Sequence, residues 1–155
     1  MKHYLSLWLV GAFMLNGWLA PADSQVLDRF AAAMDAQDIQ ALQSLYSPQV
    51  DFADINLRTH FTNSQTLLEH FGQFWRAHEA FSFKVLDSVL QDGQAALKVE
   101  WTGTIVGALF PDEKPRDYTI GGVMLLEIED GKITRQRDYI DLRTYIELFG
   151  MPPSH

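Results

Sequence analysis

The stretch that decides the fold is "DGKITRQRDYIDL", residues 130–142. Its Asp-Gly pair predicts a tight turn between two antiparallel strands, and the alternation that follows predicts a last strand over residues 133–141. Successive side chains of a strand point to opposite faces. One face therefore carries Gln136, Asp138 and Ile140, and the other carries Arg135, Arg137, Tyr139 and Asp141. Asp138 and Asp141 are thus not expected to share a pocket, and Asp141 is expected to cap the helix that follows.

Patterns on both sides of this stretch predict an α+β domain. Helical spacing of apolar residues indicates helices after Asp23, after Asp38, over residues 65–79 and over residues 142–149. Alternating stretches indicate strands at 50–54, 81–90, 95–105 and 118–128. Gly121 and Gly122, inside the last of these, predict a bulge or a close approach to the backbone. Helices gathered on an antiparallel sheet make an α+β fold, whose concave face is filled by side chains or holds a ligand.

Composition limits the partners that this domain can have. The chain has 155 residues, 47% of them hydrophobic, which suits one folded domain. A formal net charge of −8 argues against binding to nucleic acid or to an anionic membrane. There is no cysteine, no zinc signature, no phosphate-binding loop and no dinucleotide fingerprint in the sequence. We therefore expect no metal site and no cofactor.

The N-terminus has the layout of a secretory signal peptide over residues 1–22. Lys2 precedes an apolar run from Tyr4 to Leu19, and Ala20-Pro21-Ala22 supplies small residues for cleavage. This interpretation predicts a domain over residues 23–155 that is periplasmic or secreted, with no stable membrane association after processing. The alternatives are an uncleaved anchor, or an apolar helix packed on a cytoplasmic domain.

Three stretches together resemble the nuclear transport factor 2-like superfamily, and especially its SnoaL-like branch. They are "VLDRFAAAMDAQDIQALQSLYSPQVDFAD", "LLEHFGQFW" and "DGKITRQRDYIDL" followed by "LFG", and the resemblance covers residues 24–150. It implies a cone, or α+β barrel, in which a strongly bent antiparallel sheet is wrapped by the N-terminal helices around an apolar cavity. It also implies a homodimer formed through the outer sheet face. Isomerases, cyclases, dehydratases, epoxide hydrolases and non-catalytic binders share this fold.

The last strand is similar to that of the limonene epoxide hydrolases. This resemblance implies that Asp138, which stands between an arginine and a tyrosine, is a base that activates water. The hydrolases carry an arginine and a second aspartate at positions that match Trp101 and Gly103, and a tyrosine and an asparagine at positions that match Phe52 and Asp54. Of these five positions, only 138 carries the same amino acid here as in the epoxide hydrolases. Ring-closing members of the SnoaL type use an acidic residue in this strand as an acid and base, which is closer to what remains.

The resemblance favours the Asp138 face of the last strand as the inward one, and strand parity then predicts a mostly apolar cavity that contains two carboxylates. Its expected wall is made of Phe52, Asp54, Trp101, Asp138 and Ile140. An apolar wall raises the pKa of a carboxyl group, which suits acid–base catalysis by Asp138 assisted by Asp54. In the alternative interpretation, Asp54 only begins a turn, and Asp138 pairs with Arg135 or Arg137 at the sheet edge.

Two histidines are further candidates for ligand contact. His78 follows the aromatic side of the third helix, and His60 lies in a loop where the mouth of the cone is expected. Structural roles in the core or at the rim are the alternative for both. The sequence thus predicts a small-molecule pocket protein, acting as a cofactor-free isomerase, cyclase, dehydratase or hydrolase on a small apolar substrate. The alternative is a non-catalytic ligand-binding or dimerisation module.

Overall fold

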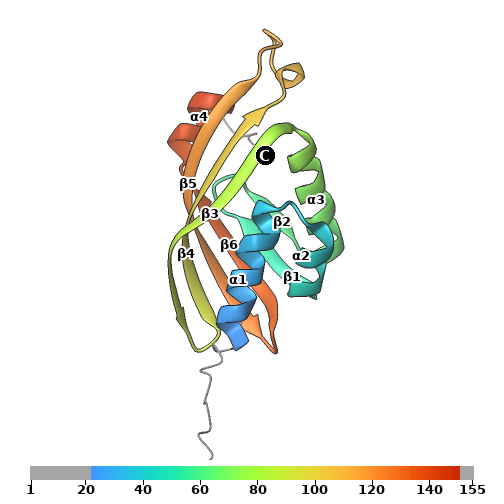
Figure 1. The fold of residues 1–155 in the computed structure, drawn as a ribbon, viewed down its shortest axis with the longest axis vertical. Helices are drawn as coiled ribbons and strands as arrows, with labels where there is room; N and C mark the ends of the chain where they lie inside the picture. Colours follow the sequence, from blue (N-terminus) through green and yellow to red (C-terminus); the bar gives the residue numbers. More distant parts are fainter. Residues whose placement is uncertain (1–21, 151–155) are drawn as a thin grey trace, which may run out of the picture.

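Six strands form one curled sheet in the computed structural model, which describes residues 22–150 (Figure 1). The strands lie in the order β2-β1-β6-β5-β4-β3. Their bounds are β1 (Tyr46–Asp54), β2 (Thr59–Phe61), β3 (His78–Gln91), β4 (Gln94–Ile105), β5 (Arg116–Glu129) and β6 (Lys132–Ile140). The helices are α1 (Ala22–Asp35), α2 (Ile39–Leu45), α3 (Ser64–Arg76) and α4 (Leu142–Phe149), with a short 3₁₀ turn at Gly107–Leu109. The α+β architecture expected from the sequence is confirmed.

The four long strands follow one another as an antiparallel meander. Asp92-Gly93 and Asp130-Gly131 make the two tight turns, and all four residues have positive φ, as a type I′ hairpin turn requires. The first strand departs from the wholly antiparallel expectation, because β1 runs parallel to β6. The sheet is therefore mixed, and the parallel pairing joins segments from opposite ends of the domain.

Register irregularities help to curl the sheet. The pairing slips between Val85 and Asp87 on β3, and between Glu127 and Ile128 on β5, and such bulges increase the local twist. No slip occurs at Gly121 or Gly122, each of which pairs with a single residue of β4. The predicted bulge is therefore absent at these glycines. The predicted close approach is found at Gly122, where the Trp101 side chain lies against the backbone.

The helices α1, α2 and α3 cover the concave face of the sheet, with α1 beside β3 and α3 along β1 (Figure 1). Each of these helices buries an apolar face, as its sequence spacing predicts. Phe30 of α1 is fully buried and packs edge-on against Tyr46 and Phe83. Among residues 22–150, the buried polar or charged side chains are Gln136 and Asp138, and both lie on the inner face of β6.

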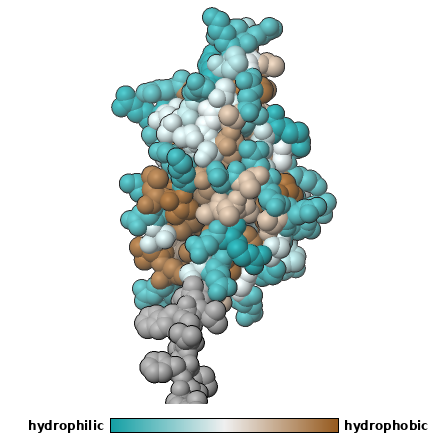
Figure 2. All heavy atoms as spheres, in the orientation of Figure 1, coloured by the Kyte–Doolittle hydropathy of each residue, from teal (hydrophilic) through white to brown (hydrophobic). Residues whose placement is uncertain are grey.

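The surface has a hydrophilic region and a hydrophobic region. The connection between β4 and β5 ends in a hydrophilic tip, and hydrophobic side chains gather over β3 and β4 at the lower left of the view (Figure 2). The exposed apolar residues of β3 are Leu86 and Val89. No helix among the described residues is long and apolar enough to cross a membrane. The predicted signal peptide, apart from Ala22, lies outside the described residues.

Candidate active site

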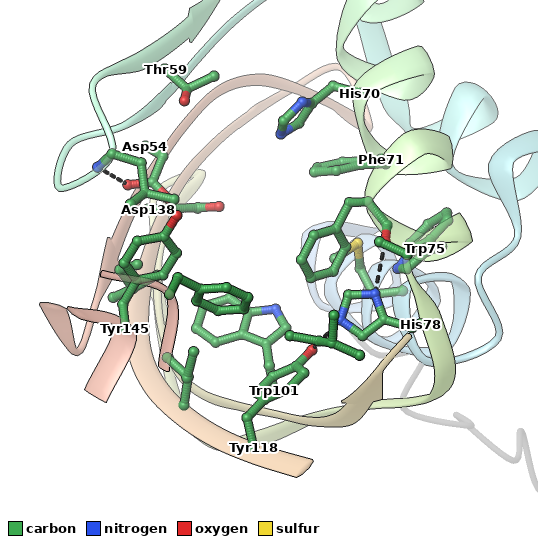
Figure 3. A pocket seen from close by; sticks show the side chains of 18 of the residues that line it. Asp54, Thr59, His70, Phe71, Trp75, His78, Trp101, Tyr118, Asp138 and Tyr145 are labelled. Atoms are coloured by element: carbon green, nitrogen blue, oxygen red, sulfur yellow. Dashed lines mark hydrogen bonds between the residues drawn. The ribbon is translucent and has the colours of Figure 1, made fainter. Parts of the chain in front are cut away.

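A cavity of about 320 Å³ lies between the concave face of the sheet and the helices α3 and α4. Its wall is mainly aromatic and aliphatic, and the phenylalanines Phe52, Phe71, Phe74 and Phe149 all contribute to it. The polar side chains in the wall are Asp54, Thr59, His70, His78, Tyr118, Asp138 and Tyr145. Asp54 and Asp138 lie on one side of the cavity, and His78 and Tyr118 lie across from them (Figure 3).

Asp138 is held in the cavity wall by a buried chain of hydrogen bonds. The side chain of Gln136 donates from Nε2 to both carboxyl oxygens of Asp138, at 2.9 and 3.1 Å. The Tyr46 hydroxyl donates to Gln136 Oε1 at 2.6 Å. Tyr46 thereby decides which end of the Gln136 amide faces the carboxyl group, because the amide oxygen is already occupied by the phenol proton.

The environment of Asp138 raises the pKa of its carboxyl group to about 8. Burial is the main cause, since only 6% of the residue is exposed. The nearby Asp54 raises the pKa further, and the hydrogen bonds from Gln136 oppose the shift. Near neutral pH, Asp138 therefore exchanges readily between its acid and base forms.

The arginines of β6 lie on the outer face and do not pair with Asp138. Arg137 donates to the carboxylate of Asp51, and Arg135 pairs with Glu127 at 2.8 Å. Hydrogen bonds from Arg137, and then from His60, lower the pKa of Asp51 to about 2. The alternative in which Asp138 pairs with Arg135 or Arg137 is therefore wrong. The pKa of the outer-face carboxyl group of Asp51 on β1 is thus lowered, whereas that of the inner-face carboxyl group of Asp138 on β6 is raised.

Asp54 both begins a turn and lines the cavity. Its Oδ1 accepts a hydrogen bond from the Leu57 backbone N–H at 2.9 Å, so it does begin the turn after β1. It also lines the cavity, and burial raises the pKa of its carboxyl group.

Asp141 caps α4 as expected, by accepting from the backbone N–H groups of Arg143 and Thr144.

Trp101 lies across the floor of the cavity because the strand beside it carries a glycine. A Cβ atom at Gly122 would come within 2.6 Å of Trp101 Cζ3, so only glycine lets the indole ring lie against β5. The indole nitrogen faces the open middle of the cavity (Figure 3). Phe52 and Ile140 complete the wall that was expected from strand parity.

His78 and Tyr118 form a second polar pair in the wall. His78 Nδ1 lies 2.7 Å from the carbonyl oxygen of Phe74, and Nε2 lies 2.8 Å from the Tyr118 hydroxyl. A Cβ atom at Gly103 would lie 3.0 Å from Tyr118 Cε1 and 3.1 Å from His78 Cδ2. Glycine at position 103 therefore leaves room for this pair.

The model of the SnoaL-like domain family matches residues 27–136 of this sequence. The chain belongs to the SnoaL-like domain family. The comparison with curated proteins found no match.

Solved structures of low sequence identity have the same fold as this SnoaL-like domain. A candidate SnoaL-like polyketide cyclase from Shewanella denitrificans superposes with a TM-score of 0.74 at 19% identity, over 83% of this chain and 96% of that chain. TsrD from Streptomyces laurentii superposes with a TM-score of 0.70 at 20% identity, over 86% and 99% of the two chains. An LEH-like epoxide hydrolase of M. tuberculosis superposes with a TM-score of 0.63 at 13% identity, over 81% and 87%.

His60 is the predicted site residue that the SnoaL-like domain places away from the cavity. Residues of the short strand β2 alternate, so that Thr59 lines the cavity and Phe61 packs on Phe52. His60 therefore points outward, where its Nε2 lies 2.9 Å from Asp51 Oδ1. The expectation that His60 borders the ligand is corrected accordingly.

Several residues of this site escaped the sequence analysis. Tyr46 and Tyr118 were missed because their partners are distant in sequence. Gln136 had a signal, because strand parity already placed it on the face of Asp138. His70 lines the cavity from α3, and burial lowers the pKa of its imidazole. Within residues 22–150, no group of three or more histidine, aspartate or glutamate side chains is placed to hold a metal ion.

Proposed function

We propose that this SnoaL-like domain binds a small, largely apolar organic molecule in its cavity and performs cofactor-free acid–base chemistry on it. The reaction class is isomerisation, cyclisation, dehydration or hydrolysis. The observation that carries the proposal is Asp138, a buried carboxyl group in an apolar cavity wall with a pKa of about 8. A pKa near the working pH is what general acid–base catalysis requires.

In this proposal the ionised form of Asp138 acts as a base, and the carboxylic acid that results then acts as an acid. Its carboxylate takes a proton from a C–H or O–H group of the bound molecule, and the neutral carboxylic acid returns a proton to the product. Gln136 holds the two carboxyl oxygens in place through both states. Asp54 assists by keeping the pKa of Asp138 high, or a water molecule in the pocket assists by relaying the proton.

One observation favours a second candidate, a non-catalytic ligand-binding module. None of the described residues that line the cavity is an arginine or a lysine. The positions that match the arginine and second aspartate of the epoxide hydrolases hold Trp101 and Gly103. A ligand oxyanion would therefore have no cationic partner in this wall.

A deuterium-exchange experiment separates these candidates. Wild type, Asp138→Asn and the outer-face control Glu100→Gln are incubated in D₂O with cyclic enones, aromatic polyols and terpene epoxides, and products are analysed by mass spectrometry. We expect exchange or turnover of one class in wild type and in Glu100→Gln. The rate should fall by about 10²–10⁴-fold in Asp138→Asn. Binding without turnover in wild type would favour the non-catalytic module, and turnover that survives Asp138→Asn would remove Asp138 from the mechanism.

We also propose a homodimer formed through the outer face of the sheet. The apolar residues exposed there include Val123 and Leu125 on β5 and Tyr139 on β6, each about 40% exposed. Val123 and Tyr139 are register partners on neighbouring strands, so these side chains form a continuous surface. A second copy of this chain would bury this surface in a symmetric contact.

We further propose, from the N-terminal sequence, that residues 1–22 direct export, so that the domain works in the periplasm or outside the cell. Intact-mass analysis of the protein recovered from the periplasm should give a chain that begins at Asp23. Recovery of the full-length chain from the cytoplasm would contradict export.

A further inference from the structure

The pair formed by His78 and Tyr118 has a fixed direction of hydrogen bonding. The Phe74 carbonyl oxygen can only accept, so the nitrogen 2.7 Å away, His78 Nδ1, carries a proton. Burial lowers the pKa of His78, which favours the neutral imidazole. A neutral imidazole has one protonated nitrogen, so His78 Nε2 presents a lone pair.

Tyr118 therefore donates its only proton to His78. Its hydroxyl oxygen lies 2.8 Å from Nε2, and burial raises the pKa of the phenol well above its ordinary value, so the phenol stays protonated. The chain runs from the Tyr118 O–H to His78 Nε2, and from His78 Nδ1–H to Phe74 O. Both polar protons of the pair are therefore used within the chain. What remains for a ligand is the lone pairs of the Tyr118 oxygen, which can only accept.

The pair is built into the cavity wall. Both side chains line the cavity, on the side across from Asp138 (Figure 3). Tyr118 is the register partner of Gly103 on β4, and a Cβ atom at position 103 would press on both members of the pair and come within 2.6 Å of the Ala80 carbonyl oxygen. The Phe74 carbonyl that ends the chain lies in the last turn of α3, where the helix dipole favours a donor such as Nδ1–H.

We propose that the Tyr118 oxygen, oriented by His78, is a subsite that accepts a hydrogen bond from a hydroxyl group of the ligand. The ligand class is an apolar ring system that carries an alcohol or phenol at the end away from Asp138. A carbonyl or ether oxygen at the same place would meet an acceptor with no proton to share, and would be disfavoured. The inference rests on the proposed function only in that the ligand occupies the same cavity.

Two probes, of which only one can donate a hydrogen bond, test the subsite. Binding of 2-naphthol and of 2-methoxynaphthalene is measured by calorimetry, since the methyl ether keeps the ring and the oxygen but cannot donate. We expect wild type to prefer 2-naphthol, and Tyr118→Phe to lose about two- to tenfold of that preference, the value of one neutral hydrogen bond. Tyr139→Phe, at a tyrosine exposed on the outer face of the sheet, should keep it.

The same titrations on Asp138→Asn separate this inference from the proposed function. A preference that survives in Asp138→Asn and falls in Tyr118→Phe supports the subsite, whether or not Asp138 is catalytic. A preference that falls in Asp138→Asn and survives in Tyr118→Phe places the hydroxyl at Asp138 and overturns the subsite. Equal binding of the two probes by wild type, or binding of neither, also overturns it.

Nitrogen NMR of histidine checks the hydrogen-bond direction without any ligand. We expect the ¹⁵N shifts of His78, assigned by comparison with His78→Gln, to show a protonated Nδ1 and an unprotonated Nε2 near neutral pH. In Tyr118→Phe, the Nε2 shift should move toward that of an imidazole nitrogen without a donor. The opposite tautomer in wild type would mean that Tyr118 has a proton free for the cavity, which contradicts the proposal.

Discussion

Asp54 of β1 and Asp138 of β6 are register partners in the parallel pairing of the two strands. Both line the cavity, and the charge of Asp54 adds to burial in raising the pKa of Asp138. Two neighbouring carboxyl groups in an apolar wall do not both ionise easily. The pair is therefore expected to hold one proton near neutral pH, mainly on Asp138.

The raised pKa of Asp138 predicts that the protein becomes less stable as the pH increases. Native Asp138 keeps its proton up to a pKa of about 8, whereas an unfolded aspartate loses it near about pH 4. Between these values the native state binds one more proton than the unfolded state. The free energy of unfolding should therefore fall by up to about 1.4 kcal/mol per pH unit from this group, and level off above its native pKa.

Urea unfolding at pH 5, 6.5, 8 and 9 measures this dependence. In Asp138→Asn the contribution is absent, so the difference in stability between the variant and wild type should shift in favour of the variant as the pH rises. Parallel profiles for the two proteins would show that Asp138 ionises normally.

Tyr46→Phe should change the pKa of Asp138 indirectly, through Gln136, which lies between the two side chains. The change leaves Gln136 Oε1 buried without its donor, which costs about 1–3 kcal/mol of unfolding free energy. It also releases the amide to turn its oxygen toward Asp138, which would raise the pKa of that carboxyl group further. A carboxyl ¹³C titration reads that pKa directly, with Tyr139→Phe, on the outer face of the sheet, as the control. An unchanged pKa in Tyr46→Phe would mean that Tyr46 has only a packing role.

The two adjacent glycines of β5 should respond differently to alanine. At Gly122 a Cβ would lie 2.6 Å from both the Trp101 ring and the Tyr139 carbonyl oxygen, whereas at Gly121 the nearest atom is 4.0 Å away. We expect Gly122→Ala to lower the free energy of unfolding by about 1–3 kcal/mol. Gly121→Ala should be neutral or slightly stabilising, because alanine restricts the unfolded chain. Chemical denaturation compares them, and equal effects would contradict the assigned contact.

The proposed homodimer predicts that one charge on the outer face changes the oligomeric state. Leu125 is 41% exposed in the single chain, and Leu125→Lys would place a further positive charge in this surface, next to its register partner Arg137. Light scattering coupled to gel filtration should give a dimer for wild type and a monomer for Leu125→Lys. Ile55→Lys, at an exposed apolar residue in the turn after β1, is the control. A monomeric wild type would refute the interface.

Local pattern was enough to predict the α+β class and to show which side chains of β6 share a face. Gln136 and Asp138 alternate with Arg135 and Arg137, but the period of two does not say which of these pairs is buried, and the resemblance to the SnoaL-like branch was needed to favour the Asp138 face. The strand β2 was missed because three residues, Thr59–Phe61, carry no measurable alternation. His78 was expected at the end of a helix but begins β3, because α3 ends at Arg76.

The pairs that define the site depend on tertiary contacts. Tyr46 and Gln136 lie 90 positions apart, and His78 and Tyr118 lie 40 apart. Each looks like an ordinary polar residue in its own segment, and its role appears only when the sheet has brought its partner beside it. The need for glycine at positions 103 and 122 likewise becomes visible only in the folded structure, where neighbouring side chains lie close to the backbone.

The parallel pairing of β1 with β6 also determines when the cavity forms during folding. The hairpins from β3 to β6 connect neighbours in the sequence and can close early, whereas β1 and β6 must enclose most of the chain before they meet. A long-range pairing forms slowly, because the chain must lose the entropy of closing a long loop before any stabilising contact between the strands is made. Asp54 reaches Asp138 only through that pairing. The chain therefore acquires its pair of neighbouring carboxyl groups in the same event that completes its sheet.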